Sequence, residues 1–110
     1  MLLAAVAQRD RPAFGALYEA LCRSTTQVAC RMLCRTEDVR AVVHGTFVEV
    51  WWMARFHPAA DTDVMAWVSG IATRRAMDRD GGDDILRGAE DETNRLVLGA
   101  LLTERGPALR

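Results

Sequence analysis

The fold is decided by residues 36–56, whose sequence is TEDVRAVVHGTFVEVWWMARF. Thr36 followed by two acids is a typical helix start, because acidic side chains stabilise the positive end of the helix dipole. Apolar residues then recur every three or four positions, which predicts one amphipathic helix of about twenty residues, roughly 30 Å long. The predicted core face consists of Val39, Val43, Phe47, Val50, Trp51 and Ala54.

A second apolar stripe lies on another side of the same predicted helix. One stripe is enough to build a small bundle, so the second is surplus and is expected to face a partner. Trp52 is its largest member, and both partner contact and partial burial remain open for it. The stripe consists of Ala41, Gly45, Val48 and Trp52. Glu49, the lone acid in the middle of this helix, is expected on a solvated face.

The segment before this stretch is also helical in pattern. Asp10 or Arg11 is expected to cap a helix whose first turn holds Pro12, where a missing N–H costs nothing. The hydroxyl run 24–26, Ser-Thr-Thr, is suited to an N-cap and predicts that a new helix begins there. The first of these helices should point Phe14, Leu17, Tyr18 and Leu21 inward.

A further helix is predicted after Pro58, which ends the long helix near Phe56. Asp61 or Thr62 is expected to cap it. The run 80–84, DGGDD, is a clear stop, and residues 93–102 are again helical in pattern. The inner face of the helix after Pro58 is predicted to hold Val64, Trp67, Val68 and Ile71.

These segments predict an all-α fold. We expect a compact bundle of about four helices over residues 1–80, and a flexible or partly helical tail over residues 81–110. Residues 1–79 hold ten arginines and eight acids, a charge of +2, whereas residues 80–110 hold four arginines and seven acids, a charge of −3. The body is therefore mildly basic and the tail acidic, and there is no lysine.

Several function classes are disfavoured. The longest apolar run, residues 1–7, is far short of the ~20 residues of a membrane helix and lacks the basic start of a signal peptide, so we expect a cytoplasmic protein without membrane insertion. No phosphate loop, nucleophile elbow or His-Glu metal motif is present, so we expect no enzyme and no cofactor. Cys30 and Cys34, with His44, could hold a metal, but packing in a core is the favoured interpretation.

Three stretches carry a resemblance to a known family. They are AFGALY at 13–18, TFVEVW at 46–51 followed by ARF at 54–56, and AWVSGIATRRAMDR at 66–79. Together, in this order, they resemble region 2 of the extracytoplasmic-function sigma factors, over roughly residues 2–80. The stretch 96–105 faintly resembles the entry to region 4, whose helix-turn-helix is not reached.

The resemblance implies a function in transcription initiation. In this family the long third helix docks on the beta-prime clamp of core RNA polymerase. The following loop traps a base flipped from the minus-ten promoter element, which costs a few kcal/mol that stacking must recover. The implied DNA-binding residues are Arg55, Phe56, His57, Arg74, Arg75 and Arg79. The implied interface with polymerase or an anti-sigma factor is Arg40, Ala41, His44, Gly45, Val48 and Trp52.

The chain departs from the family pattern in two places. Arg40, Ala41, His44 and Gly45 stand where acidic and amide residues usually meet the clamp, and acids follow the fourth helix where basic residues usually continue. These departures support a second interpretation, a sigma-like decoy that binds an anti-sigma factor and does not direct transcription. The arginines near residue 75 are also what the helix dipole alone would favour.

Overall fold

The computed structural model describes residues 2–56, 63–79 and 84–103. Every regular element in these ranges is helical, which confirms the all-α prediction. The elements are α1 (Leu2–Ala7), α2 (Arg11–Met32), α3 (Thr36–Met53), the 3₁₀ turn η1 (Ala54–Phe56), α4 (Val64–Asp78) and α5 (Asp84–Thr103). No helix in the described ranges is both long and apolar enough to span a membrane.

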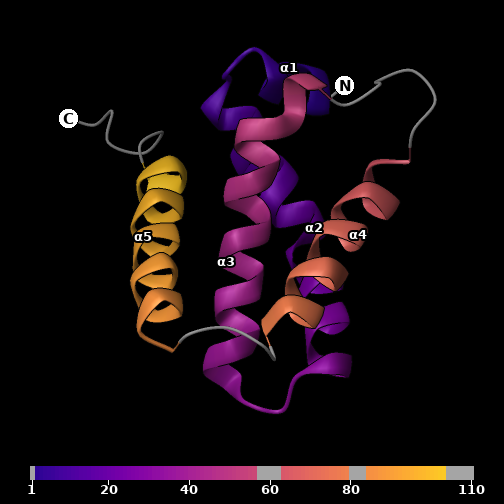
Figure 1. Cartoon of the computed structure of the whole chain (residues 1–110). Helices are drawn as coiled ribbons and strands as arrows, with labels where there is room; N and C mark the ends of the chain where they lie inside the picture. The colour runs from indigo at the N-terminus through magenta and orange to yellow at the C-terminus, as the bar shows by residue number, and fades with distance from the viewer. Residues whose placement is uncertain (1, 57–62, 80–83, 104–110) are drawn as a thin grey trace.

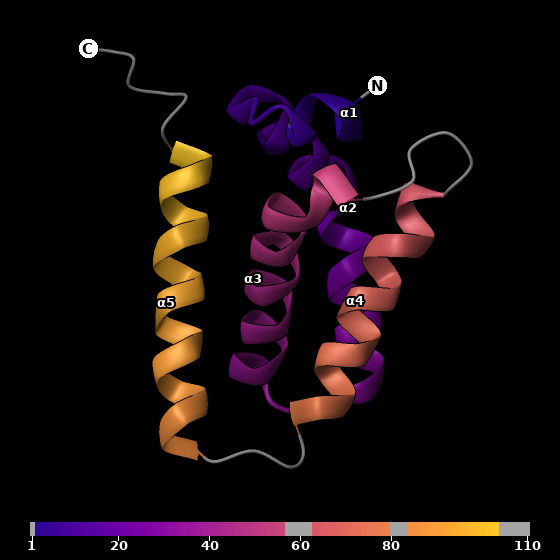
Figure 2. The same ribbon diagram turned by 45° about the horizontal axis from the view of Figure 1, so that its top comes forward.

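Helix α3 lies between α4 on one side and α5 on the other (Figures 1 and 2). Helix α2 crosses behind and packs against α3, α4 and α5, while the short α1 closes one end beside η1 (Figure 1). Four helices therefore form the predicted bundle, and α5 is added to its flank.

The main core is formed where α2, α3 and α4 meet. Phe14, Phe47 and Val50 are fully buried, as the amphipathic pattern predicts. Two edge-to-face aromatic pairs join α2 to α3: the ring centroids of Phe14 and Trp51 are 5.3 Å apart, and those of Tyr18 and Phe47 are 4.9 Å apart. Such pairs add stabilisation beyond their buried area.

Helix α2 is one continuous helix, so the helix start predicted at residues 24–26 is wrong. Instead of capping a new helix, the hydroxyls of Thr25 and Thr26 donate to the carbonyls of Leu21 and Cys22 one turn back, at 2.8 Å each. A Ser or Thr hydroxyl can form this hydrogen bond inside a helix, so these residue types fit a helix interior as well as a helix cap. The predicted cap at Asp10 is confirmed, because its Oδ1 accepts from the Ala13 amide at 3.0 Å.

Helix α4 is capped by Asp63 and not by either residue predicted for that role. The Asp63 carboxylate accepts from the amides of Met65 and Ala66, at 3.0 and 3.3 Å. Asp61 and Thr62, the predicted caps, lie outside the described residues. The helix thus begins one or two residues later than the sequence indicated.

Helix α5 begins at Asp84, well before the predicted start at residue 93. The tail was expected to be flexible or partly helical, and residues 84–103 are helical. Leu98 and Leu101 are buried in the main core cluster together with Val48 of α3. This packing places the acidic segment against the bundle.

Candidate nucleic-acid and partner interface

The predicted site residues separate into two regions of the molecule. Trp52, Arg55 and Phe56 lie where α3 ends in η1, beside α1. Arg74, Arg75 and Arg79 lie on the last turns of α4 and line a cleft that α3 and α5 also border. His57, assigned to the DNA-binding set, lies outside the described residues.

The first region is an exposed aromatic surface at the end of α3, here called the aromatic end and defined by Trp52, Met53, Arg55 and Phe56. The side chains of Trp52 and Phe56 are 54% and 64% exposed. The Arg55 guanidinium lies 5.0 Å from the centroid of the Phe56 ring. Exposed rings next to a guanidinium suit the stacking of nucleic-acid bases or a partner's apolar side chain.

Arg9 holds the aromatic end in place from the turn between α1 and α2. Its guanidinium carbon lies 5.2 Å from the ring centroids of both Trp51 and Trp52. Its Nη1 donates to the Trp51 carbonyl at 2.6 Å. Arg9 adopts a left-handed backbone with φ of 66°, which is uncommon outside glycine and fixes the direction of this turn. No local pattern predicts this contact, because it joins residues 42 positions apart.

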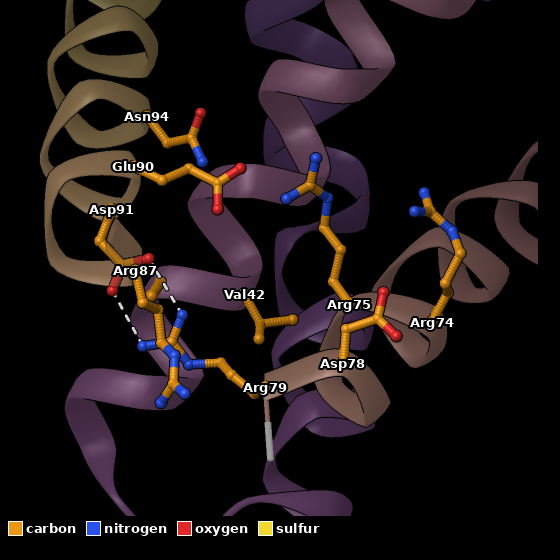
Figure 3. A pocket seen from close by; sticks show the side chains of 10 residues that line it. Val42, Arg74, Arg75, Asp78, Arg79, Arg87, Glu90, Asp91 and Asn94 are labelled. Atoms are coloured by element: carbon orange, nitrogen blue, oxygen red, sulfur yellow. Dashed lines mark hydrogen bonds and ion pairs between the residues drawn. The ribbon is translucent and has the colours of Figure 1, made fainter. Parts of the chain in front are cut away.

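The second region is a cleft of about 550 Å³ between α3, α4 and α5 (Figure 3). Eight of its ten lining residues are polar or charged, and they carry both signs of charge. In Figure 3, Arg79 reaches toward Asp91 of α5, whereas Arg74 lies on the far side from α5. The lining residues are Ala41, Val42, Arg74, Arg75, Asp78, Arg79, Arg87, Glu90, Asp91 and Asn94.

Glu49 is not on a solvated face as predicted, but joins α3 to α4. Its carboxylate accepts from Arg74 Nη2 at 2.5 Å and from Arg75 Nε at 2.9 Å. The Glu49 side chain is 22% exposed, so these pairs are partly shielded from solvent. Two of the candidate phosphate-binding arginines therefore share one carboxylate of the chain itself, which offsets one of their two positive charges.

Arg79 forms a second ion-pair cluster, here called the Arg79 clasp and defined by Asp38, Arg79 and Asp91. Arg79 donates to Asp38 on α3 from Nε and Nη2, at 3.1 and 2.9 Å. It donates to both oxygens of Asp91 on α5, at 3.0 and 2.9 Å. The Arg79 side chain is only 13% exposed, and its hydrogen bond to Asp91 is the main reason that its pKa is raised. Arg79 is thus placed as a tie between three helices.

The second stripe of α3 is largely covered by α5. Ala41 and Val48 are each 8% exposed, and a Cβ on Gly45 would lie 3.2 Å from the Asn94 amide nitrogen of α5. The surplus apolar face predicted from the sequence exists, but the chain's own tail occupies it. Of the four residues in this stripe, Trp52 alone is exposed.

Arg40 and His44 lie on the edge of that face, beside a smaller cleft between α3 and α5. Arg40 is exposed and His44 is half-buried. Burial lowers the pKa of His44, and the nearby charges of Arg40 and Arg95 lower it further, against an opposing effect of Asp91. His44 therefore favours its neutral form in the folded chain.

Cys30 and Cys34 do not form part of the core as interpreted from the sequence, whereas Cys22 packs against it. Cys30 and Cys34 are exposed, and Cys22 is half-buried. Cys30 follows Ala29, which is fully buried, so the helix turns the thiol outward at this point. Among the described residues no group of three or more His, Cys, Asp or Glu side chains is placed to hold a metal ion.

A comparison with curated proteins finds a similar chain. The chain is 30% identical over 78 residues to the ECF RNA polymerase sigma factor SigK of Mycobacterium ulcerans (strain Agy99). The match covers 71% of this chain and 42% of that protein, so the chain spans less than half of its relative. No family model matches the sequence, and no solved structure matches it. The similarity supports a distant, sigma-factor-like relationship.

Proposed function

We propose that residues 1–80 act as a sigma-factor region 2, which binds core RNA polymerase and opens the minus-ten promoter element. In this proposal residues 81–110 form the linker and the start of region 4. The distant similarity to an ECF sigma factor supports a role in transcription, and the four-helix body agrees with the domain that carries it. The protein would then work in the cytoplasm, with polymerase and promoter DNA as partners.

The aromatic end is the observation that carries the proposal. Two exposed rings and a guanidinium lie directly before the loop that the resemblance assigns to base capture. Stacking of one base on an aromatic side chain is worth about 1–3 kcal/mol, which matches the cost of extracting a base from the duplex. Arg55 lies beside the Phe56 ring, where it can meet the phosphate of the stacked nucleotide.

The polymerase contact would use the second stripe of α3 and its edge, most of which α5 covers in the free chain. Arg40 and Trp52 are its accessible members, and His44 is half-buried between them. An exposed tryptophan and an arginine are the residue types most often found at the energetic centre of interfaces.

The test is binding of a labelled single strand of minus-ten sequence to the full chain mixed with core RNA polymerase. Phe56→Ala should weaken strand binding by about tenfold, from the loss of one stacked base. The matched control is Leu96→Ala, because Leu96 is similarly exposed, at 55%, on α5. An equal effect of both substitutions, or no strand binding by the mixture, would contradict the proposal.

A second candidate function, the decoy, is favoured by the internal pairing of the α4 arginines. Arg74, Arg75 and Arg79 each contact a carboxylate of this chain, which weakens their attraction for phosphate. A decoy would bind an anti-sigma factor and leave polymerase unbound. Titration of the chain into core polymerase separates the two functions, since region 2 forms a complex and a decoy does not.

Trp52→Ala examines the surface that both functions share. The substitution should leave the free energy of unfolding nearly unchanged, because the Trp52 side chain is more than half exposed. It should weaken binding to polymerase or to an anti-sigma factor by tenfold or more if Trp52 is a central contact. Unfolding of this variant in mild denaturant would instead make Trp52 a structural residue.

A further inference from the structure

We infer that α5 is a reversible cover, which closes the partner-binding face of α3 in the free chain and moves aside when polymerase binds. The inference rests on the function proposed above. It adds that the chain regulates its own partner face, through a contact between its basic body and its acidic tail.

The covered face is the one that the sequence marks as surplus. Ala41, Gly45 and Val48 lie on one side of α3, and all three are buried. Within α1 to α4, Phe14, Phe47 and Val50 are fully buried, and Leu98 and Leu101 of α5 join the same cluster from its flank. The face is therefore shaped for a further helix, and α5 is the helix that occupies it (Figure 2).

The two halves of α5 are attached by different forces. Its second half is held by burial of Leu98 and Leu101, which are 3% and 5% exposed. Over residues 87–93 of its first half no side chain is buried and the contacts are polar, because Asp91 accepts two hydrogen bonds from Arg79. The residues on either side of Asp91, Glu90 and Glu92, are charged and exposed to solvent.

Clefts on both sides of this first half show how loosely it is packed. One cleft, of about 550 Å³, lies between it and α4, and the other, of about 230 Å³, lies along α3 near His44. Close-packed interiors leave few such spaces, so residues 87–93 of α5 pack less closely on the body than Leu98 and Leu101 do, and the Arg79 clasp bridges the larger cleft. Segments with few buried apolar contacts are the ones that open locally, without unfolding of the whole domain.

Opening would be linked to nucleic-acid binding through Arg79 itself. Arg79 pairs with Asp91 in the closed form and belongs to the α4 cluster proposed to meet promoter phosphates. A phosphate that engages Arg79 competes directly with Asp91, because both are anions that use the same donors. Cover opening and strand binding would then support each other, as linkage requires.

The test compares two substitutions on the same helix that remove the same charge. Asp91→Asn weakens the clasp across to α4, whereas Glu92→Gln weakens a pair with Arg95 within α5. Hydrogen exchange of the full chain should show α5 amides exchanging about tenfold faster in Asp91→Asn, with α2 and α3 unchanged. The apparent affinity for core polymerase should rise several-fold, because it scales with the fraction of open molecules. Glu92→Gln should change neither quantity.

A second readout examines the cover without polymerase. Ala41→Cys, in a chain whose three native cysteines are replaced by serine, places a thiol beneath α5. Its labelling rate should increase in the Asp91→Asn background. If labelling instead requires denaturant at the level that unfolds the whole chain, α5 is a fixed part of the fold and the inference is overturned.

The outcomes separate the cover from the proposed function. Faster α5 exchange with unchanged or weaker polymerase binding overturns the inference, because α5 would then not compete with polymerase. Faster labelling at residue 41, with no polymerase binding by any variant, supports an opening cover and overturns the function proposed above.

Discussion

Arg79 is the charged residue that joins three helices through ion pairs. It reaches Asp38, 41 positions earlier, and Asp91, 12 positions later, through four hydrogen bonds of 2.9–3.1 Å. Removing the Arg79 side chain would lower the free energy of unfolding for two reasons. These hydrogen bonds are lost, and the carboxylates of Asp38 and Asp91 lose this partner. Such carboxylates keep part of their hydration, since Asp38 and Asp91 are 24% and 29% exposed.

Arg79→Ala should lower the free energy of unfolding by about 2 kcal/mol, as expected for charge-assisted hydrogen bonds at a partly buried site. Urea unfolding followed by circular dichroism measures the difference. The matched control is Arg35→Ala, which removes an ion pair with Glu37 whose side chains are both 69% exposed. The control should have no measurable effect, and equal effects would mean that the clasp does not stabilise the fold.

The lowered pKa of His44 predicts a pH dependence of stability. Between the pKa of the folded chain and the ordinary value of 6.5, the unfolded chain binds more protons than the folded chain. Stability therefore rises with pH across that window and is lost as the solution is acidified from about pH 7, at less than ~1.4 kcal/mol per pH unit for one group.

His44→Gln should flatten this part of the pH profile of unfolding, measured by urea titration between pH 5 and 7.5 as roughly the window set by the histidine pKa. His57 is retained in both chains, so its contribution cancels in the comparison. A profile that keeps its slope in the variant would assign the dependence to another group.

The sequence could predict which residues of α3 face the core, but not which charges pair. Hydrophobic spacing within one helix identified Phe47 and Val50 as buried, because that spacing depends only on the helical period. Glu49 was misjudged as solvated, since its partners Arg74 and Arg75 lie 25 and 26 positions away on another helix. Periodicity carries no information on contacts of this range.

At the level of single helices, a comparison of Gly45 and Gly70 distinguishes intrinsic helix preference from the effect of tertiary packing. Gly70 lies on α4 with open space around it, whereas a Cβ on Gly45 of α3 would lie 2.7 Å from Arg75 Nη1. Both residues are inside helices, where alanine is favoured over glycine by about 1 kcal/mol.

Gly70→Ala should therefore raise the free energy of unfolding by up to about 1 kcal/mol. Gly45→Ala should gain clearly less, because the new methyl group displaces the Arg75 guanidinium from its position near Glu49. Chemical denaturation of the two variants measures the difference. An equal gain at both positions would mean that Arg75 moves without cost.

Helix boundaries show the same limit of sequence interpretation. The start of α3 at Thr36 was predicted correctly, because acids in the first turn act locally. The continuity of α2 and the early start of α5 were missed, because Ser24–Thr26 and the stretch around Gly88 have weak helix preference on their own. Packing against neighbouring helices decides such cases.

For the whole molecule, the burial pattern predicts an order of stability. The slowest amide exchange should occur in the middle of α2 and α3, around Thr25 and Phe47, where side chains are fully buried. The fastest among the helices should occur in the first half of α5 and in the six-residue α1. Native-state hydrogen exchange at increasing denaturant checks this order, and uniform exchange across all helices would contradict it.

The contrast between two neighbouring tryptophans gives the molecule a built-in optical probe. Trp51 is 5% exposed and Trp52 is 54% exposed, although they are adjacent in sequence. In a Trp67→Phe chain, which removes the half-buried third indole, a small neutral quencher such as acrylamide would reach Trp52 and spare Trp51, so the quenchable part of the emission reports on one surface patch. Docking of any large molecule on that patch would shield it and shift its emission to shorter wavelength, so complex formation can be followed without attaching a dye.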